Sequence, residues 1–293
     1  MKKKLLGIII EITILISLII AYSYYIEPKL LTFKEYQIKN ENITENFEGF
    51  KIVHISDIHY GNVFDKKQMQ KLVNSINDQK PDIVIITGDL IDKDTKMTIE
   101  LSEEISSLLG KINSKIGKYA INGEEDLKFD EWANIIKNSN FTDLNNTYDT
   151  IYKNGYSSLL IAGISSKNDK QDINEKINKT IEYINSFEKD GPIYKILLMH
   201  EPDNIDYIET NKFDLILAGH SHHGQIKLFS IPLILKEGSK KYYKGHYKIE
   251  NTNIYISNGL GVSKPNFRLF NTPSYNIYKL NKGVIKWVKK QKY

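Results

Sequence analysis

Four short polar clusters, each at the end of an apolar run, constrain the fold of this chain most. They are Asp57-Ile58-His59, Gly88-Asp89-Leu90-Ile91-Asp92, Met199-His200-Glu201 and Gly219-His220-Ser221-His222-His223-Gly224-Gln225. The runs that lead into them have the length and apolar character of buried β-strands, and they cover Lys51–Ser56, Asp82–Thr87, Ile193–Met199 and Asp214–Ala218. Ionisable side chains concentrated where strands end are typical of a site built at the edge of a sheet. The sequence therefore predicts an α/β scaffold whose strand ends gather these residues.

Helical periodicity alternates with the strand-like runs. Apolar residues at helical spacing predict helices over Asp65–Gln79, Met97–Ile112, Phe129–Ile136 and Ile173–Phe187. Further strands are expected at Lys118–Ile121, Ser158–Ala162, Asn253–Ser257, Tyr275–Leu280 and Val284–Val288. Strand–helix alternation followed by a strand-rich tail predicts layered sheets flanked by helices. We expect one such domain over residues 51–293, preceded by a connecting segment, 27–50, with one short strand at Thr32–Ile38.

The N-terminus has the pattern of a membrane segment. Lys2-Lys3-Lys4 precedes an apolar stretch from Leu5 to Ile26 that is interrupted by Glu11. As a helix this stretch would extend about 33 Å, enough to cross a bilayer. The leading lysines favour an N-terminus inside and a body on the extracytoplasmic side. Residues 1–26 are therefore predicted to be a single-pass anchor in the cell membrane. A signal segment cleaved near Ala21-Tyr22-Ser23, which would release a secreted protein, is the alternative.

Composition narrows the chemistry of the polar clusters. The chain has a net charge of only +4 with lysines spread along its length, so we expect no dedicated nucleic-acid partner. It has no cysteine, which excludes thiolate ligands, disulfides and a cysteine nucleophile. Histidines and carboxylates remain, and this mixture suits Mn, Fe or Zn more than Mg or Ca.

The spacing within the clusters predicts how ligands meet. In extended backbone, Asp57 and His59 would point to the same side, and His220 and His222 repeat that spacing. Asp89 follows Gly88, a residue that lets the backbone approach closely or adopt an unusual conformation. A carboxylate has two oxygens with spare lone pairs, so Asp89 is able to bridge two cations.

On these residues the chain resembles the calcineurin-like metallophosphoesterases, from about Lys51 to Leu280. The residues around His200 and from Ala218 to Ile226 look like the bacterial membrane-anchored or exported branch, which includes proteins similar to UDP-2,3-diacylglucosamine hydrolases. The resemblance implies a four-layer α/β/β/α sandwich with two divalent metal ions at the strand ends. It also implies ligand roles: Asp57, His59 and His222 for one ion, His200 and His220 for the other, Asp89 as the bridge, and Asp92 behind the ligands.

One family motif is altered. The family normally has Gly-Asn-His-Asp or Gly-Asn-His-Glu after the strand at 117–121, where this chain reads Asn122-Gly123-Glu124-Glu125-Asp126. Glu124 then stands at the metal-binding Asn, and Glu125 at the His that contacts the scissile phosphate. A shifted alignment would make Asn122 the ligand instead. His223 is either a substitute for the missing catalytic imidazole or a loop histidine.

The resemblance implies hydrolysis of a phosphodiester or phosphomonoester. Two cations about 3.5–4 Å apart clamp phosphate oxygens and lower the pKa of a bound water. With the anchor, it implies action at the membrane surface on a lipid-linked or nucleotide-sugar substrate. The alternative is a catalytically impaired metal-binding or ligand-binding protein, because an ionised Glu125 repels phosphate and donates no proton.

Overall fold

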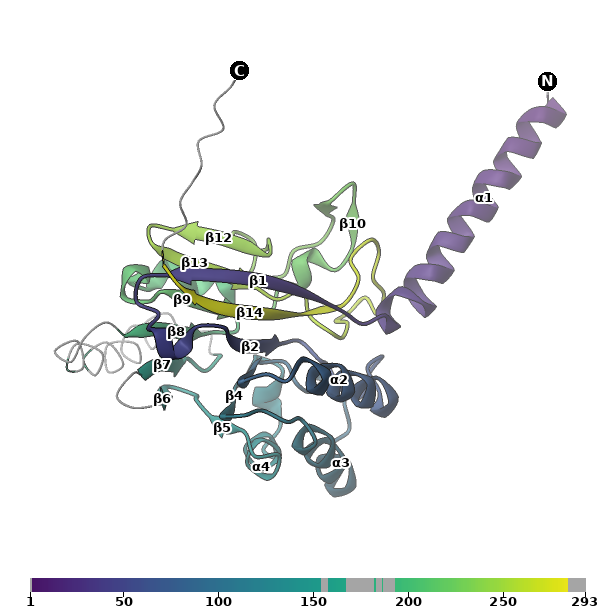
Figure 1. Cartoon of the computed structure of the whole chain (residues 1–293). Helices are drawn as coiled ribbons and strands as arrows, with labels where there is room; N and C mark the ends of the chain where they lie inside the picture. Colours follow the sequence, from purple (N-terminus) through teal and green to yellow (C-terminus); the bar gives the residue numbers. More distant parts are fainter. Residues whose placement is uncertain (1, 154–157, 167–181, 183–185, 187–192, 284–293) are drawn as a thin grey trace, which may run out of the picture.

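The computed structural model describes residues 2–153, 158–166, 182, 186 and 193–283 (Figure 1). Two six-stranded mixed sheets form the body. The first contains, in spatial order, β1 (Thr32–Asn40), β14 (Ser274–Lys282), β2 (Phe50–Ile55), β3 (Ile83–Thr87), β4 (Gly117–Ile121) and β5 (Thr142–Asp143). The second contains β12 (His246–Ile249), β13 (Thr252–Ile256), β9 (Leu215–Ala218), β8 (Tyr194–Leu198), β7 (Ser158–Gly163) and β6 (Thr147–Tyr152).

Alternating side chains place the sheets in layers. In β2, Val53 and Ile55 pack in one core with α2 (Lys66–Gln79), α3 (Ile99–Gly110) and α4 (Trp132–Asn138). Phe50 and Ile52 of the same strand pack instead against strands of the second sheet. This is the period-two alternation of a strand buried on both faces. The predicted α/β sheet architecture is thereby confirmed.

The second sheet has its own outer core. Ile216 and Ile254 pack there with Ile205, Phe213 and Tyr242. The helix predicted over 173–187, apart from residues 182 and 186, and the strand predicted over 284–288 lie outside the described residues.

The segment 27–50 packs as part of the sheets. β1 runs two residues past the predicted strand, Thr32–Ile38, and pairs in parallel with β14 along its whole length. Ile43 and Phe47 lie in the core between the sheets. Apolar contacts on this segment therefore join it to the body.

Parallel strands bring the polar clusters to one edge. β2, β3 and β4 are parallel neighbours, so the residues after Ile55, Thr87 and Ile121 emerge together. β8 and β9 are parallel in the second sheet and deliver the residues after Leu198 and Ala218. Segments far apart in sequence thus meet where both sheets end.

The helix after β2 begins at a capping box, in which Asp65 accepts from the Gln68 backbone N–H and the Gln68 side chain accepts from the Asp65 N–H.

The N-terminal helix α1 (Lys2–Tyr25) extends away from the body (Figure 1). The helical stretch Lys2–Lys29 is long and apolar enough to cross a membrane, and none of its apolar window is buried in the protein. Its end is tied to the body by the Arg268 N–H, which donates to the Ser23 carbonyl at 3.0 Å. The buried Glu27 carboxylate accepts from the backbone N–H groups of Phe270 and Asn271.

Candidate metal centre

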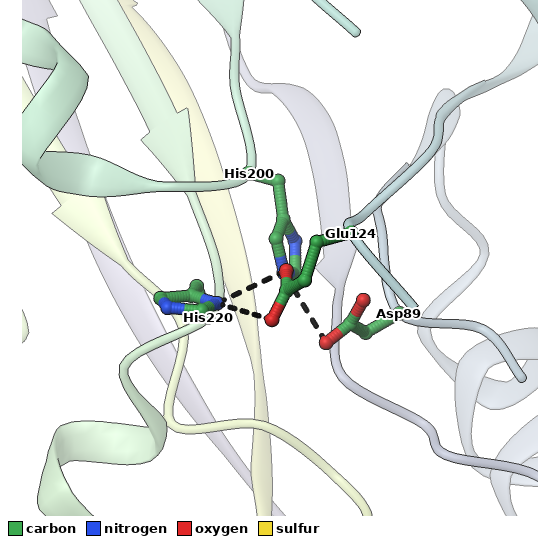
Figure 2. Close-up of side chains that lie close together, drawn as sticks. All are labelled: Asp89, Glu124, His200 and His220. Carbon is green, nitrogen blue, oxygen red and sulfur yellow. Dashed lines mark hydrogen bonds and ion pairs between the residues drawn. The ribbon is translucent and has the colours of Figure 1, made fainter. Parts of the chain in front are cut away.

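Among the described residues, three groups of mostly buried ligand-type side chains lie at the strand ends; the third, His59, Asp92 and Glu125, shares His59 with the second. The first, which we call the Glu124 group, consists of Asp89, Glu124, His200 and His220 (Figure 2). The second, the Asp57 group, consists of Asp57, His59 and His222. In each group, one ligand atom per residue lies within 4.8 Å of the others. These groups contain all seven of the residues that the sequence predicted as metal ligands.

Within the Glu124 group the donor atoms face one another. His200 Nε2 lies 2.8 Å from Glu124 Oε2 and 3.3 Å from Asp89 Oδ2. His220 Nδ1 lies 3.0 Å from Glu124 Oε1. Figure 2 shows Glu124 between the two imidazoles, with Asp89 beside it. The group offers two nitrogens and two carboxylates to a single ion.

Asp89 connects this group to the Asp57 group. Its Oδ2 is 3.8 Å from His59 Nε2, in addition to its contact with His200. Across the Asp57 group, His59 Nε2 is 3.1 Å from His222 Nε2, and His222 Nε2 is 3.5 Å from Asp57 Oδ1. The position of Asp89 between the two groups is that of a bridging carboxylate.

Left-handed backbone, rather than extended backbone, presents the ligands. Asp57, His59, Asp89, His220 and His222 all have φ between 44° and 65°. The prediction of an extended Asp57–His59 step is therefore wrong, and so is its repeat at His220–His222. The strands end at Ile55 and Ala218, and the chain turns sharply after them. Such conformations cost a non-glycine residue about 1 kcal/mol or more, and they cluster at functional sites.

Two glycines make room for the turn at Asp89. Gly88 has φ +88°, and a Cβ there would meet Gly123 N and His200 Nδ1 at 2.5 Å each. A Cβ on Gly123 would lie 2.2 Å from Asp89 Oδ1. The close approach predicted for Gly88 is confirmed, and Gly123 proves equally constrained.

The outer nitrogens of the four histidines have different partners. His200 Nδ1 is 2.6 Å from the Thr87 carbonyl, and His220 Nε2 is 2.5 Å from the Glu237 carbonyl. Each ring therefore donates outward and, when neutral, has a lone pair on the nitrogen that faces the group, free for a metal ion. His59 Nδ1 likewise donates to Glu125 Oε2 at 3.0 Å.

His222 is the exception. Its Nδ1 lies 3.1 Å from the Nη2 of Arg268, a group that only donates. Arg268 is fully buried and also donates to the carbonyls of Asn258, Gly261 and Asn271. A neutral His222 that accepts from Arg268 carries its proton on Nε2, the nitrogen that faces His59.

Burial and neighbouring charges shift the pKa values of the buried site residues in both directions. Burial raises the pKa of Asp57, and it raises the pKa of Asp126, next to Asp89, to about 7. Burial by itself would lower the pKa of His200, but Asp89 and Glu124 outweigh it and raise that pKa well above its usual range. Burial also disfavours the charged forms of Asp89 and Glu124, but His200 outweighs it and lowers the pKa of both carboxyls.

The other predicted site residues have the following positions. Glu125, which is buried, accepts from His59 and from the Lys93 backbone N–H. Asn122 lies outside both groups, and its side chain accepts from the Ser166 N–H, so the structure brings Glu124 and not Asn122 to the centre. Asp92 is buried behind the ligands, close to His59 and Glu125.

His223 points elsewhere. Its Nε2 lies 2.8 Å from the carbonyl of Ile256, and its ring packs against Gly245. Burial lowers its pKa to about 3. The ring is therefore neutral and bonded to the end of β13.

A cleft of about 830 Å³ opens over the Glu124 group, and Glu124, Glu125 and His220 line part of its wall. Its other lining includes a set of basic side chains that sequence analysis did not identify: Lys93, Lys236, Lys241 and Lys264. Lys241 pairs with Asp206, and Lys264 pairs with Asp94. The ammonium group of Lys236 has no hydrogen bond or ion pair with any described residue.

The residues present fit two divalent cations. Asp89 Oδ2 and His200 Nε2 are buried, lack a hydrogen-bond partner among the described residues, and face each other. Both atoms lie in ion-pair contact but lack a well-directed hydrogen bond, and a cation between them would be coordinated by both. Ligand atoms about 2.0–2.2 Å from an ion lie roughly 3–4 Å apart, as the donors in both groups do.

Comparison with known proteins gives the same family that the residues indicate. Residues 50–224 match the family described as calcineurin-like phosphoesterase. The metallophosphoesterase YkuE of Bacillus subtilis is 31% identical over 264 residues, which cover 88% of this chain and 88% of that protein.

A second relative is a zebrafish protein, named as a transmembrane protein with a metallophosphoesterase domain. It is 26% identical over 243 residues, which cover 80% of this chain and 53% of the relative. The chain thus spans about half the length of that protein. Among solved structures, one titled as GAP50, the anchor in the inner membrane complex of Plasmodium, aligns with a TM-score of 0.48 and 10% identity over 78% of this chain and 80% of that one.

Proposed function

The chain belongs to the calcineurin-like phosphoesterase family, and we propose that it is a binuclear metal-dependent phosphoesterase that acts at a membrane surface. The observation that supports this most is the junction of the two groups at Asp89, whose Oδ2 lies near both His200 and His59. A shared carboxylate between two sets of imidazoles is what two adjacent cations require.

The ligand roles follow the two groups. Asp57, His59 and His222 would hold one ion, and Glu124, His200 and His220 the other, with Asp89 shared. Mn, Fe or Zn suit this mixture of nitrogen and oxygen donors. Bound, the two ions would supply positive charge to phosphate oxygens and a water acidic enough to act near neutral pH.

Glu125 would position a ligand rather than touch substrate. Its carboxylate accepts the outer N–H of His59, which fixes the ring with Nε2 facing inward. It therefore does not stand in for the family's phosphate-contacting histidine. We assign His223 no contact with substrate, because its ring is bonded to the Ile256 carbonyl.

Lys236 would supply the missing positive group. It lines the cleft together with Glu124 and His220, and its charge acts on Asp57, His59 and His222. An unpaired ammonium at this position binds a non-bridging phosphate oxygen and stabilises the charge that grows there during hydrolysis.

The first experiment uses the full chain in detergent, loaded with Mn²⁺, and a generic aryl phosphodiester. Asp89→Asn should abolish hydrolysis, whereas the matched control Asp78→Asn, on the exposed end of α2, should retain it. Equal rates for both variants would refute the assignment of Asp89 to the metal centre. So would the absence of hydrolysis by the natural protein when it is loaded with Mn, Fe or Zn.

The second experiment concerns Lys236. Lys236→Met should lower kcat about a hundredfold, the usual effect of removing one charge-stabilising donor. Lys236→Arg should restore part of the loss. Lys240→Met, an exposed neighbour outside the cleft lining, is the control.

A catalytically impaired binding protein is the competing function, and the engagement of Glu125 with His59 supports it. The double change Glu124→Asn and Glu125→His separates the two. Turnover that rises about 10²–10⁴-fold, the contribution of one general acid, would favour impairment in the natural protein. A fall would show that the glutamates serve this centre as they are.

Membrane association is supported by α1 and by relatives named as transmembrane proteins. We propose that α1 is a retained anchor with the body on the extracytoplasmic side, because Lys2-Lys3-Lys4 at its start precedes its apolar stretch. A phosphoester on a lipid or nucleotide sugar would then reach the cleft from the membrane surface. A cysteine introduced into the body should react with a membrane-impermeant reagent in intact cells, and protection until lysis would reverse this orientation.

A further inference from the structure

An exposed apolar hairpin lies next to the end of the anchor helix. β10 (Lys227–Leu228) and β11 (Ile231–Pro232) pair antiparallel and are joined by a two-residue turn. The apolar side chains on it and beside it are more than a third exposed, which is unusual for such a concentration on a soluble surface. We call them the hairpin patch: Leu228, Phe229, Ile231, Leu233, Ile234 and Phe270.

The turn of the hairpin is unfavourable in water. Phe229 is 89% exposed and has φ 49°, and Ser230 has φ 69°. Two positive φ angles define a turn that ordinarily takes Asn-Gly, so an aromatic residue there is a local cost. Nothing among the described residues covers the Phe229 ring, which leaves it free to contact a surface beyond them.

Continuity with α1 identifies what covers it. β10 is joined to the segment 267–271, because Lys227 N–H donates to the Leu269 carbonyl at 2.9 Å. The same segment holds the end of α1. The Arg268 N–H donates to the Ser23 carbonyl, and the ring of Phe267 stacks on that of Tyr24 with 6.4 Å between the ring centroids. In Figure 1 the hairpin and α1 both rise from the same side of the body. The hairpin is therefore one segment away from the place where the anchor leaves the bilayer.

The charges at its base are also suited to a membrane. Lys34 of β1 is close enough to Lys227 of β10 for its charge to act on it, and neither ammonium pairs with a carboxylate of the described residues. Unpaired lysines at the edge of an apolar surface attract anionic headgroups.

We propose that the hairpin patch inserts into the bilayer interface and that Lys34 and Lys227 contact anionic headgroups. This rests on the membrane anchoring of the proposed function. Phe229 lies two residues beyond Lys227, so it reaches about 7 Å past the segment that holds α1, within the depth of the interface. Lys236, two residues after Ile234, would then bring one wall of the cleft to within about 7 Å of the membrane surface.

The test uses fluorescence and needs no activity, so its failure is distinct from failure of the proposed hydrolysis. The chain has no cysteine, which allows single-cysteine variants of the full protein to be labelled with an environment-sensitive dye. Phe229→Cys and Ile231→Cys probe the hairpin. Ile99→Cys is the control, because Ile99 is 75% exposed at the start of α3 and lies outside the patch.

In vesicles containing phosphatidylglycerol and a shallow spin-labelled lipid, the dye at 229 and 231 should lose emission and shift to the blue. The dye at 99 should do neither. Emission at 229 that matches that at 99 would overturn the proposal. So would a blue shift at 229 that depends on protein concentration and not on the lipid quencher, since that indicates a protein partner.

A second variant tests the lysines. Lys34→Gln with Lys227→Gln should reduce quenching at 229 in vesicles with phosphatidylglycerol and leave it unchanged in purely zwitterionic ones. If the double variant and the protein with both lysines are quenched equally in vesicles with phosphatidylglycerol, the lysines make no contact with headgroups, and that part of the proposal is wrong. Folding of each variant is verified by its Mn²⁺ binding.

Discussion

The two halves of the metal centre are held in different ways. In the Glu124 group, the outer nitrogens of His200 and His220 donate to the main-chain carbonyls of Thr87 and Glu237. In the Asp57 group, side chains do this work: Glu125 accepts from His59, and Arg268 donates to His222. Main-chain carbonyls are present whatever the sequence, whereas side-chain partners change with a single substitution. The Asp57 group is therefore the half whose affinity this chain can adjust.

A buried positive charge next to the Asp57 group also makes it the weaker of the two sites for a cation. Each group has one carboxylate of its own, Glu124 or Asp57, in addition to the shared Asp89, so the carboxylates do not distinguish the two groups. The Asp57 group has Arg268 next to a ligand, and that arginine places the His222 proton on the nitrogen that faces the other ligands. An ion entering the Asp57 group has to displace that proton or the arginine contact. We expect the Glu124 group to fill first and to release its ion last.

The largest effect should follow from Glu124→Ala. This change removes the only unshared carboxylate of the tighter half, so its ion should be lost with a drop in affinity greater than the 10–100-fold usual for partners behind the ligands. Titration with Mn²⁺ should show one site instead of two. Glu103→Ala, at an exposed position of α3, is the control. Two sites of unchanged affinity would show that the assignment of Glu124 is wrong.

Glu125→Gln should weaken only the Asp57 group. The amide keeps the size of the side chain but loses the charge that makes the His59 ring a better ligand, and a loss of about 10–100-fold is expected for that ion. The measurement is the same titration, with the tighter site as an internal reference. Equal weakening of both sites would contradict the division of the centre into two halves.

The clustering of the candidate ligands was predictable from sequence because each follows an apolar strand. Parallel pairing brings the residues after Ile55 and Thr87 together in one sheet and those after Leu198 and Ala218 together in the other, and the packing of the two sheets then joins the two pairs. Their local conformation was not predictable, because the left-handed turns at Asp57 and His220 depend on close backbone contacts such as those around Gly88 and Gly123.

The residues behind the ligands were harder to find. Arg268 is almost fifty residues from His222 in sequence, and no motif marks it. One signal was present: it is the only arginine among 40 basic residues. A buried group that donates to several carbonyls at once needs the planar fork of a guanidinium, which lysine lacks. Lys236 had no such signal, since it is one lysine among many and only the folded cleft distinguishes it.

Arg268→Lys should lower the thermal stability of the metal-free protein and raise the metal affinity of the Asp57 group. Lysine leaves some of the carbonyls of Asn258, Gly261 and Asn271 unpaired, at about 1–3 kcal/mol for each buried group, so thermal unfolding of the metal-free protein should shift to lower temperature. The same change frees His222 Nδ1 to carry the proton, so the affinity of the Asp57 group should rise, by about tenfold. A fall in both would mean that Arg268 supports the metal site.

The smallest effect on metal should come from His223→Gln. The ring is adjacent in sequence to a ligand but bonds the Ile256 carbonyl, so both ions should bind as in the natural protein. The free energy of unfolding should fall by about 1–3 kcal/mol, because the glutamine side chain does not reach the buried Ile256 carbonyl, which then loses its donor. His222→Gln is the matched comparison: it should lose the ion of the Asp57 group. If His223→Gln instead lowers kcat while stability and metal content are unchanged, the ring reaches the substrate, and the site has a catalytic imidazole after all.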